Sequence, residues 1–263
     1  MKKLIPLVIL LAFAGCTPTI TPEQEQEPQE EVAPVEETVV EEAREITDAD
    51  LGVSEKSIEE ETEHYTIYVV YPETIGATKL NQVIEDHVQE TIDFFKAEVE
   101  ETLPYLEDLE DIGKSSLYIT YEIHTLSTKL ASIQFGNSHY SAGAAHPNFY
   151  TSVLNYDMQE NKEIELVDLF VEDSEYLVTL SDYVIPELAD QMMIDFEYTD
   201  LEWITQGAAP EEVNYSAFVF NTDGLWFTFD PYIVGPYAIG PQYITVPYTL
   251  VDDILNDYAN GLL

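Results

Sequence analysis

The chain has 263 residues, of which 52 are Asp or Glu and 9 are Lys or Arg, so its formal net charge is −43. This charge excludes a grip on the phosphate backbone of nucleic acid as the main activity, because such a grip needs clustered Lys and Arg, and it argues against adhesion to anionic lipid. It favours either a cationic partner or a saline habitat, in which an acidic surface is a general trait.

Residues 1–15 are typical of a signal peptide. Lys2 and Lys3 precede an apolar run, Leu4 to Ala14, which is shorter than the roughly 20 residues that span a bilayer. Cys16 is the only cysteine and follows Ala-Gly directly, as in the lipobox of bacterial lipoproteins. We therefore expect an extracytoplasmic protein that is anchored to the cell membrane by a lipid on Cys16. A plain secretory signal with an incidental cysteine is the alternative.

Residues 16–63 are predicted to be a disordered acidic linker that carries this lipid. From Thr17 to Glu63 the chain has no aromatic residue, and residues 21–63 hold seventeen Asp or Glu against Arg44 and Lys56. Such a segment cannot bury enough apolar surface to offset the entropy of ordering it. We expect a solvated spacer; an acidic arm that contacts a cationic partner is the alternative.

Residues 64–263 alternate between strand-like and helix-like patterns. They predict an α+β fold of two closely packed α/β lobes, residues 64–137 and 138–263, with mostly antiparallel sheets and helices on one face. Pro186 falls inside the second helix, so we expect a kink there or two shorter helices. The expected strands are 65–71, 117–124, 130–135, 149–156, 164–166, 215–220, 225–229 and 243–246. The expected helices are one from residue 80 that ends near Pro104, one over 176–192 and a C-terminal one from 247.

A loop of small residues between His139 and His146 is the first candidate site. Pro147 pushes His146 toward extended geometry, so this histidine lies at a rigid corner. Two hypotheses give this loop a chemical role. In the first, the two histidines bind zinc together with Asp157 or Asp230. In the second, Ser141 is a nucleophile and a histidine is its base. The chain has neither HExxH nor G-x-S-x-G, so we favour His146 as an anchor of the corner through hydrogen bonds from its ring.

Aromatic residues on a Gly-Pro loop form the second candidate. Tyrosines there offer rigid contact area to a protein or a sugar ring, although they are equally suited to packing the two lobes together. We therefore expect no catalytic residue, no metal and no cofactor. The candidate binding residues are His139, His146, Asn148, Trp226, Tyr232, Tyr237 and Tyr243.

The order of several motifs resembles a known bacterial extracytoplasmic family, the domain of unknown function 3298, and residues 65–134 resemble its frequent partner, the domain of unknown function 4163. The motifs that carry the resemblance are Gly143-Ala-Ala-His-Pro-Asn148, Ile164-Glu-Leu-Val-Asp-Leu-Phe170, Trp226-Phe-Thr-Phe-Asp-Pro-Tyr232, Gly235-Pro-Tyr-Ala-Ile-Gly240 and Thr245-Val-Pro-Tyr248.

The resemblance extends to two better-understood groups of proteins: the extracellular part of RsiV-type anti-sigma factors, which binds lysozyme, and the N-terminal region of PdaC-type peptidoglycan deacetylases. We see no sigma-binding segment before the domain and no deacetylase domain after it in this sequence, so we expect neither activity to carry over. The resemblance implies a non-enzymatic envelope module that binds a cationic lysozyme-like protein or peptidoglycan glycan. The alternative is a hydrolase of wall glycan or peptide that uses the His146 loop.

Overall fold

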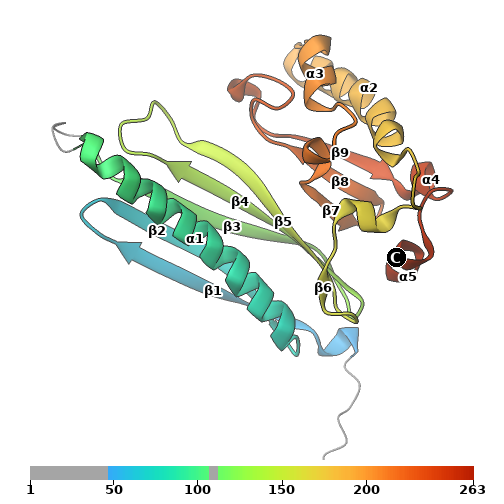
Figure 1. The fold of residues 1–263 in the computed structure, drawn as a ribbon, viewed down its shortest axis with the longest axis horizontal. Coiled ribbons are helices and arrows are strands. Elements are labelled where there is room, and N and C mark those ends of the chain that lie inside the picture. Colours follow the sequence, from blue (N-terminus) through green and yellow to red (C-terminus); the bar gives the residue numbers. More distant parts are fainter. Residues whose placement is uncertain (1–46, 107–111) are drawn as a thin grey trace, which may run out of the picture. The chain divides into compact units, whose positions relative to one another are not determined.

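The computed structural model describes residues 47–106 and 112–263 (Figure 1). They form an α+β fold with a six-stranded and a three-stranded sheet, each covered by helices, as predicted. Short 3₁₀ turns lie at Asp48–Asp50, Leu166–Leu169, Glu212–Tyr215 and Tyr237–Ile239. The strands are β1 (Gly52–Glu61), β2 (Tyr65–Ile75), β3 (Ser115–Leu126), β4 (Leu130–Tyr140), β5 (Asn148–Asp157), β6 (Lys162–Glu163), β7 (Phe218–Asn221), β8 (Gly224–Phe229) and β9 (Gln242–Pro247), and the helices are α1 (Thr78–Leu106), α2 (Tyr176–Phe196), α3 (Leu201–Gly207), α4 (Tyr248–Val251) and α5 (Asp257–Leu262).

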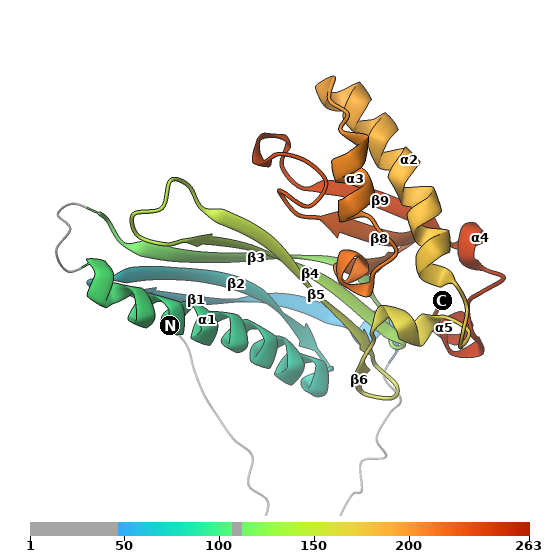
Figure 2. The ribbon, with the colours of Figure 1, turned by 45° about the horizontal axis from the view of Figure 1, so that its top comes forward.

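The six-stranded sheet has the order β1-β2-β3-β4-β5-β6. Its pairs are antiparallel except β2 and β3, which are parallel because α1 forms the crossover between them. The apolar face of α1 packs on one face of this sheet, against alternate residues of β2 to β5. Figure 2 shows α1 on one side of the sheet and the three-stranded sheet on the other.

The three-stranded sheet, β7-β8-β9, holds the second core together with α2. The predicted hairpin is confirmed: Asn221 pairs with Gly224 at its turn. Tyr215, which lies just before β7, is fully buried, and its ring meets those of Phe227 and Phe229 edge-on. Most of the chain after β6 therefore packs around this smaller sheet.

Side chains of the larger sheet hold the open edge of β7. The Asn155 amide donates to the Phe218 carbonyl at 2.8 Å, and the Phe220 N–H donates to the Ser132 hydroxyl at 2.8 Å. The Thr125 hydroxyl donates to the Phe220 carbonyl at 2.7 Å. Backbone groups that would otherwise be a template for another strand are thereby satisfied within the chain.

Several expected boundaries differ in the structure. Composition predicts a linker that extends to residue 63, but residues 52–61 form β1, and Lys56 on it pairs with Glu73 of β2 and Glu85 of α1. The boundary expected after residue 137 lies inside β4. The expected strand at 164–166 is reduced to β6 and a 3₁₀ turn.

The expected break at Pro186 does not divide α2, which runs as one helix from Tyr176 to Phe196. Pro186 is exposed there, so its ring takes no space in the core. The expected C-terminal helix is two short ones, α4 and α5. No helix within residues 47–106 and 112–263 is long and apolar enough to cross a membrane. The predicted signal peptide, Cys16 and most of the linker lie outside the described residues.

Candidate functional site

His146 stacks on Tyr237, with ring centres 4.3 Å apart and planes at 28°. Its Nδ1–H donates to the Pro147 carbonyl at 2.8 Å, which leaves Nε2 as an acceptor that faces the Tyr232 hydroxyl at 3.5 Å. The Tyr237 hydroxyl donates to the same carbonyl at 3.2 Å. The structure thus brings three of the predicted binding residues together, and all three keep exposed ring surface.

The loop that carries Tyr232 and Tyr237 is positioned by α3. The Trp203 indole N–H donates to the Tyr232 carbonyl at 3.1 Å, and Tyr232 has a φ of 75°, which is strained for a large side chain. The chain passes so near α3 that a Cβ on Gly207 would lie 2.0 Å from the Ile233 carbonyl oxygen. Such packing favours a preformed loop, as a recognition surface requires.

Asp230 joins this loop to β5. Its carboxylate accepts hydrogen bonds from the Thr151 N–H and the Thr151 hydroxyl, both at 2.8 Å. Burial raises the pKa of Asp230, although the two hydrogen bonds from Thr151 act in the opposite direction. The loop is therefore held at its first residue as well as at its tip.

Trp226 and Tyr243 form a second aromatic pair, with ring centres 5.6 Å apart. His124 of β3 lies 5.8 Å from Trp226, and within the described part of the chain the buried Trp226 Nε1 and His124 Nε2 have no hydrogen-bond partner. The Tyr243 pKa is raised by burial and by the negative charges of Asp230 and Glu122. Trp226 is half-buried between the two sheets, while Tyr243 is exposed.

Sequence reasoning missed three further rings, Tyr68, Tyr118 and Phe149, on the face of the larger sheet that points away from α1. Tyr68 pairs with Tyr118, Tyr118 with Ser138, and Ser138 with Phe149, so the three rings share one row across four strands. They are 43%, 48% and 39% exposed. Strand alternation already placed Tyr68 and Tyr118 opposite buried neighbours, but only the register puts them in one row.

We call these rings and the loop rings together the aromatic surface: Tyr68, Tyr118 and Phe149 on the sheet, and His146, Tyr232, Tyr237 and Tyr243 beside it. A hollow of about 570 Å³ lies beside Tyr68, and Val70, Thr120, Glu55 and Glu122 also line it. Exposed aromatic rings of this kind suit the apolar faces of sugars or of a protein partner.

His139 does not join the aromatic surface. It points toward α1, where its ring meets Phe95 edge-on and its Nε2 lies 3.5 Å from the Glu98 carboxylate and 3.4 Å from the Ser141 hydroxyl. Ser141 donates to Glu98 at 2.9 Å. Ser141 and Glu98 therefore contact the same nitrogen of His139, Nε2, and also each other. In a catalytic triad the serine and the acid contact opposite nitrogens of the histidine. Asn148 is exposed at the start of β5.

The zinc set considered from the sequence is not assembled. The Asp157 carboxylate accepts from the N–H groups of Gln159 and Glu160, and Asp230 is bonded to Thr151. Among the described residues, no group of three or more His, Cys, Asp or Glu side chains is arranged to hold a metal ion.

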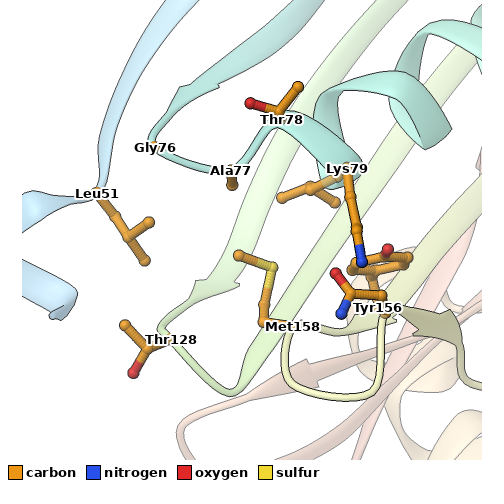
Figure 3. Close-up of a pocket in the computed structure, with 10 residues that line it drawn as sticks. Leu51, Gly76, Ala77, Thr78, Lys79, Thr128, Tyr156 and Met158 are labelled. Atoms are coloured by element: carbon orange, nitrogen blue, oxygen red, sulfur yellow. The ribbon is translucent and has the colours of Figure 1, made fainter. Parts of the chain in front are cut away.

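A separate hollow of about 320 Å³ lies where β1 and α1 begin and β5 ends (Figure 3). Leu51, Ala77, Lys79, Tyr156 and Met158 line it, and the Lys79 side chain extends toward Tyr156. Among the six lysines in the described residues, Lys79 is the one without an ion pair or hydrogen bond. None of the residues that the sequence singles out lines this hollow.

Comparison with known families agrees with the two-part pattern. Residues 58–149 match the family model described as deacetylase PdaC, and residues 167–249 match the one described as a protein of unknown function, DUF3298. The chain therefore has a PdaC-like region followed by a DUF3298-like region, in the predicted order.

Individual relatives are similar in part. The peptidoglycan-N-acetylmuramic acid deacetylase PdaC of Bacillus subtilis (strain 168) is 28% identical over 144 residues, which is 55% of this chain and 30% of the deacetylase. A crystal structure of a DUF3298 family member from Bacteroides fragilis NCTC 9343 has a TM-score of 0.52 at 21% identity, over 81% of this chain and 96% of the other. One from Pseudomonas aeruginosa PAO1 has a TM-score of 0.60 at 14% identity, over 81% and 97%. These likenesses show the fold.

Proposed function

We propose that this protein is a non-enzymatic binding module of the cell envelope that holds wall glycan on its aromatic surface. The observation that carries the proposal is the set of exposed rings from the sheet and from the braced loop. Rings held in place by packing lose little entropy when a ligand binds, and the partial similarity to a protein named as a peptidoglycan deacetylase supports glycan as the ligand.

The proposal is tested by co-sedimentation of the full chain with insoluble peptidoglycan. We expect the chain to sediment with the glycan, and the paired change Tyr118→Ala and Tyr237→Ala to weaken binding at least about tenfold, since stacked rings commonly dominate recognition. Tyr105→Ala is the matched control, because Tyr105 is 80% exposed and lies on α1, on the other side of the sheet. Equal binding by all three proteins would reject the aromatic surface.

A second candidate ligand, a cationic lysozyme-like protein, is favoured by the distribution of charge. From Glu163 to Leu263 the chain contains no Lys, Arg or His, while acidic residues recur throughout. Such a surface speeds the approach of a cationic protein by electrostatic steering. Calorimetric titration with a c-type lysozyme at low and high salt separates the cases: heat that persists at high salt indicates a specific site, and heat that vanishes indicates charge attraction alone.

We place the protein outside the cytoplasm, tethered to the membrane by a lipid on Cys16. The apolar run and the Ala-Gly-Cys sequence support this proposal. Membrane fractionation tests it: the chain should enter the detergent phase, and Cys16→Ser should move it to the aqueous phase. A wild-type chain found in the aqueous phase would overturn the anchor.

A further inference from the structure

Carboxylates border the sheet part of the aromatic surface. Glu59 of β1 is the register partner of Tyr68, and it extends the row of rings to the edge of the sheet. Glu55 and Glu122 line the hollow beside Tyr68. All three glutamates are exposed, and Glu122 lies near enough to Tyr243 for its charge to affect that phenol. The rings of the sheet part thus have Glu59 on one side, at the edge of the sheet, and Glu122 on the side toward Tyr243.

No lysine of the described residues lines this hollow. Lys56 and Lys96 are bound to carboxylates on or beside α1, and Lys114 pairs with Glu61 at the end of β1. Lys129 donates to the Gly261 carbonyl, and Lys162 lies over the Tyr258 ring. The carboxylates that flank the rings therefore have no cationic partner within the described part of the chain, which leaves them available to a ligand.

We propose that the aromatic surface prefers amino-sugar polymers whose amines are free, and therefore cationic, over their N-acetylated forms. The inference rests on the proposed glycan-binding function and names the ligand's chemistry. The sugar rings stack on Tyr68, Tyr118 and Phe149, while an ammonium group donates charge-assisted hydrogen bonds to Glu59 or Glu122. An N-acetyl group carries no positive charge and keeps one N–H where the ammonium has three, so it gains little from these exposed carboxylates.

The neighbouring tyrosines reinforce the preference. Tyr68 and Tyr118 have ring centres 6.4 Å apart, and an ammonium near their faces is attracted by the ring quadrupole. Both contributions depend on the positive charge of the ligand. Replacing the carboxylates removes the larger one and leaves ring stacking unchanged.

The test is calorimetric binding of the full chain to a soluble chito-oligosaccharide in its free-amine and N-acetylated forms, at a pH where the amines are protonated. We expect the free-amine form to bind about three- to tenfold more tightly, as two exposed ion pairs allow. The paired change Glu59→Gln and Glu122→Gln should remove that preference and leave binding of the N-acetylated form unchanged. Glu100→Gln with Glu101→Gln, two exposed acids of α1, is the matched control and should keep the preference.

Three other outcomes of this binding experiment would contradict the proposed preference. Equal binding of the two forms, or tighter binding of the N-acetylated form, overturns the amine preference and leaves glycan binding standing. Binding of neither form overturns the glycan-binding function and this inference with it. Free-amine binding that survives Tyr118→Ala, or that falls equally in the control pair, reveals attraction of a polycation to an acidic protein and also overturns the inference.

Discussion

A half-buried carboxylate, Asp230, helps to hold the loop that carries Tyr232 and Tyr237. It satisfies two donors of Thr151 at once, and no neutral side chain of the same size accepts two hydrogen bonds without also presenting a donor or losing an oxygen. The charge has a cost, because burial raises the pKa of this acid above its ordinary value. The loop is thus positioned by a group whose ionised form is disfavoured in the folded state.

This shift predicts a dependence of stability on pH. Because the pKa is higher in the folded state, the folded chain binds the proton more tightly, so the contribution of Asp230 to the free energy of unfolding decreases as pH rises from the unfolded to the folded pKa. Asp230→Asn does not titrate. The free energy of unfolding of wild type minus that of Asp230→Asn should therefore fall in urea titrations as pH rises above the ordinary carboxyl pKa of Asp, about 3.9. Parallel pH profiles would contradict the assignment.

The sequence predicts which residues belong to the candidate site better than it predicts which residues they contact. The corner at His146 and the tyrosines near it were found from Pro147 and the Gly-Pro loop, and the structure brings His146, Tyr232 and Tyr237 into contact. Nearness in sequence groups His139 with these residues. Strand parity turns it to the face that α1 covers, and no local pattern reveals which face will be covered.

Among the elements, β7 has the most unusual support. One of its edges pairs with β8, and side chains of β3, β4 and β5 bind the other. Asn155 is central, since its amide nitrogen donates to Phe218 and its oxygen accepts from Ser132. Buried polar groups of this kind stabilise only while every member keeps a partner.

Asn155→Ala should lower the free energy of unfolding by about 1–3 kcal/mol, because it leaves the Phe218 carbonyl without its donor and the Ser132 O–H without its acceptor. Urea denaturation followed by tryptophan fluorescence measures the change, and Trp226, next to β7, reports on this region. Gln82→Ala, an exposed change on α1, should stay within about 0.5 kcal/mol of wild type. A similarly small change for Asn155→Ala would show that β7 does not depend on this contact.

The elements that the sequence missed share a physical reason. β1 has few apolar residues and many glutamates, so its composition indicates disorder, and it is a strand because β2 supplies its hydrogen-bond partners. Pro186 breaks a local rule, yet α2 continues because Val184, Leu188 and Met192 are buried on the same face around it. Most elements with a clear apolar period were predicted, whereas elements defined by their neighbours were not.

The charge of the whole molecule is unevenly distributed. Lys162 is the last basic residue of the chain, so every charged side chain after it, in the part around the smaller sheet, is acidic. Of the five described lysines before it, Lys56, Lys96 and Lys114 form local ion pairs. Like charges repel most strongly in the compact state, because unfolding moves them apart. Repulsion between the carboxylates therefore lowers the free energy of unfolding of this protein.

Added salt should consequently stabilise this protein. The Debye length falls from about 30 Å at 0.01 M to about 3 Å at 1 M, so repulsion among the many unpaired carboxylates is screened. The few exposed ion pairs weaken as well, but each contributes little. We expect the urea midpoint to rise between these salt concentrations, and a neutral solute at equal osmolality to produce a smaller rise. A midpoint that falls with salt would mean that the ion pairs outweigh the repulsion, and the surface would then be a balanced network, with less reason to seek a cationic ligand.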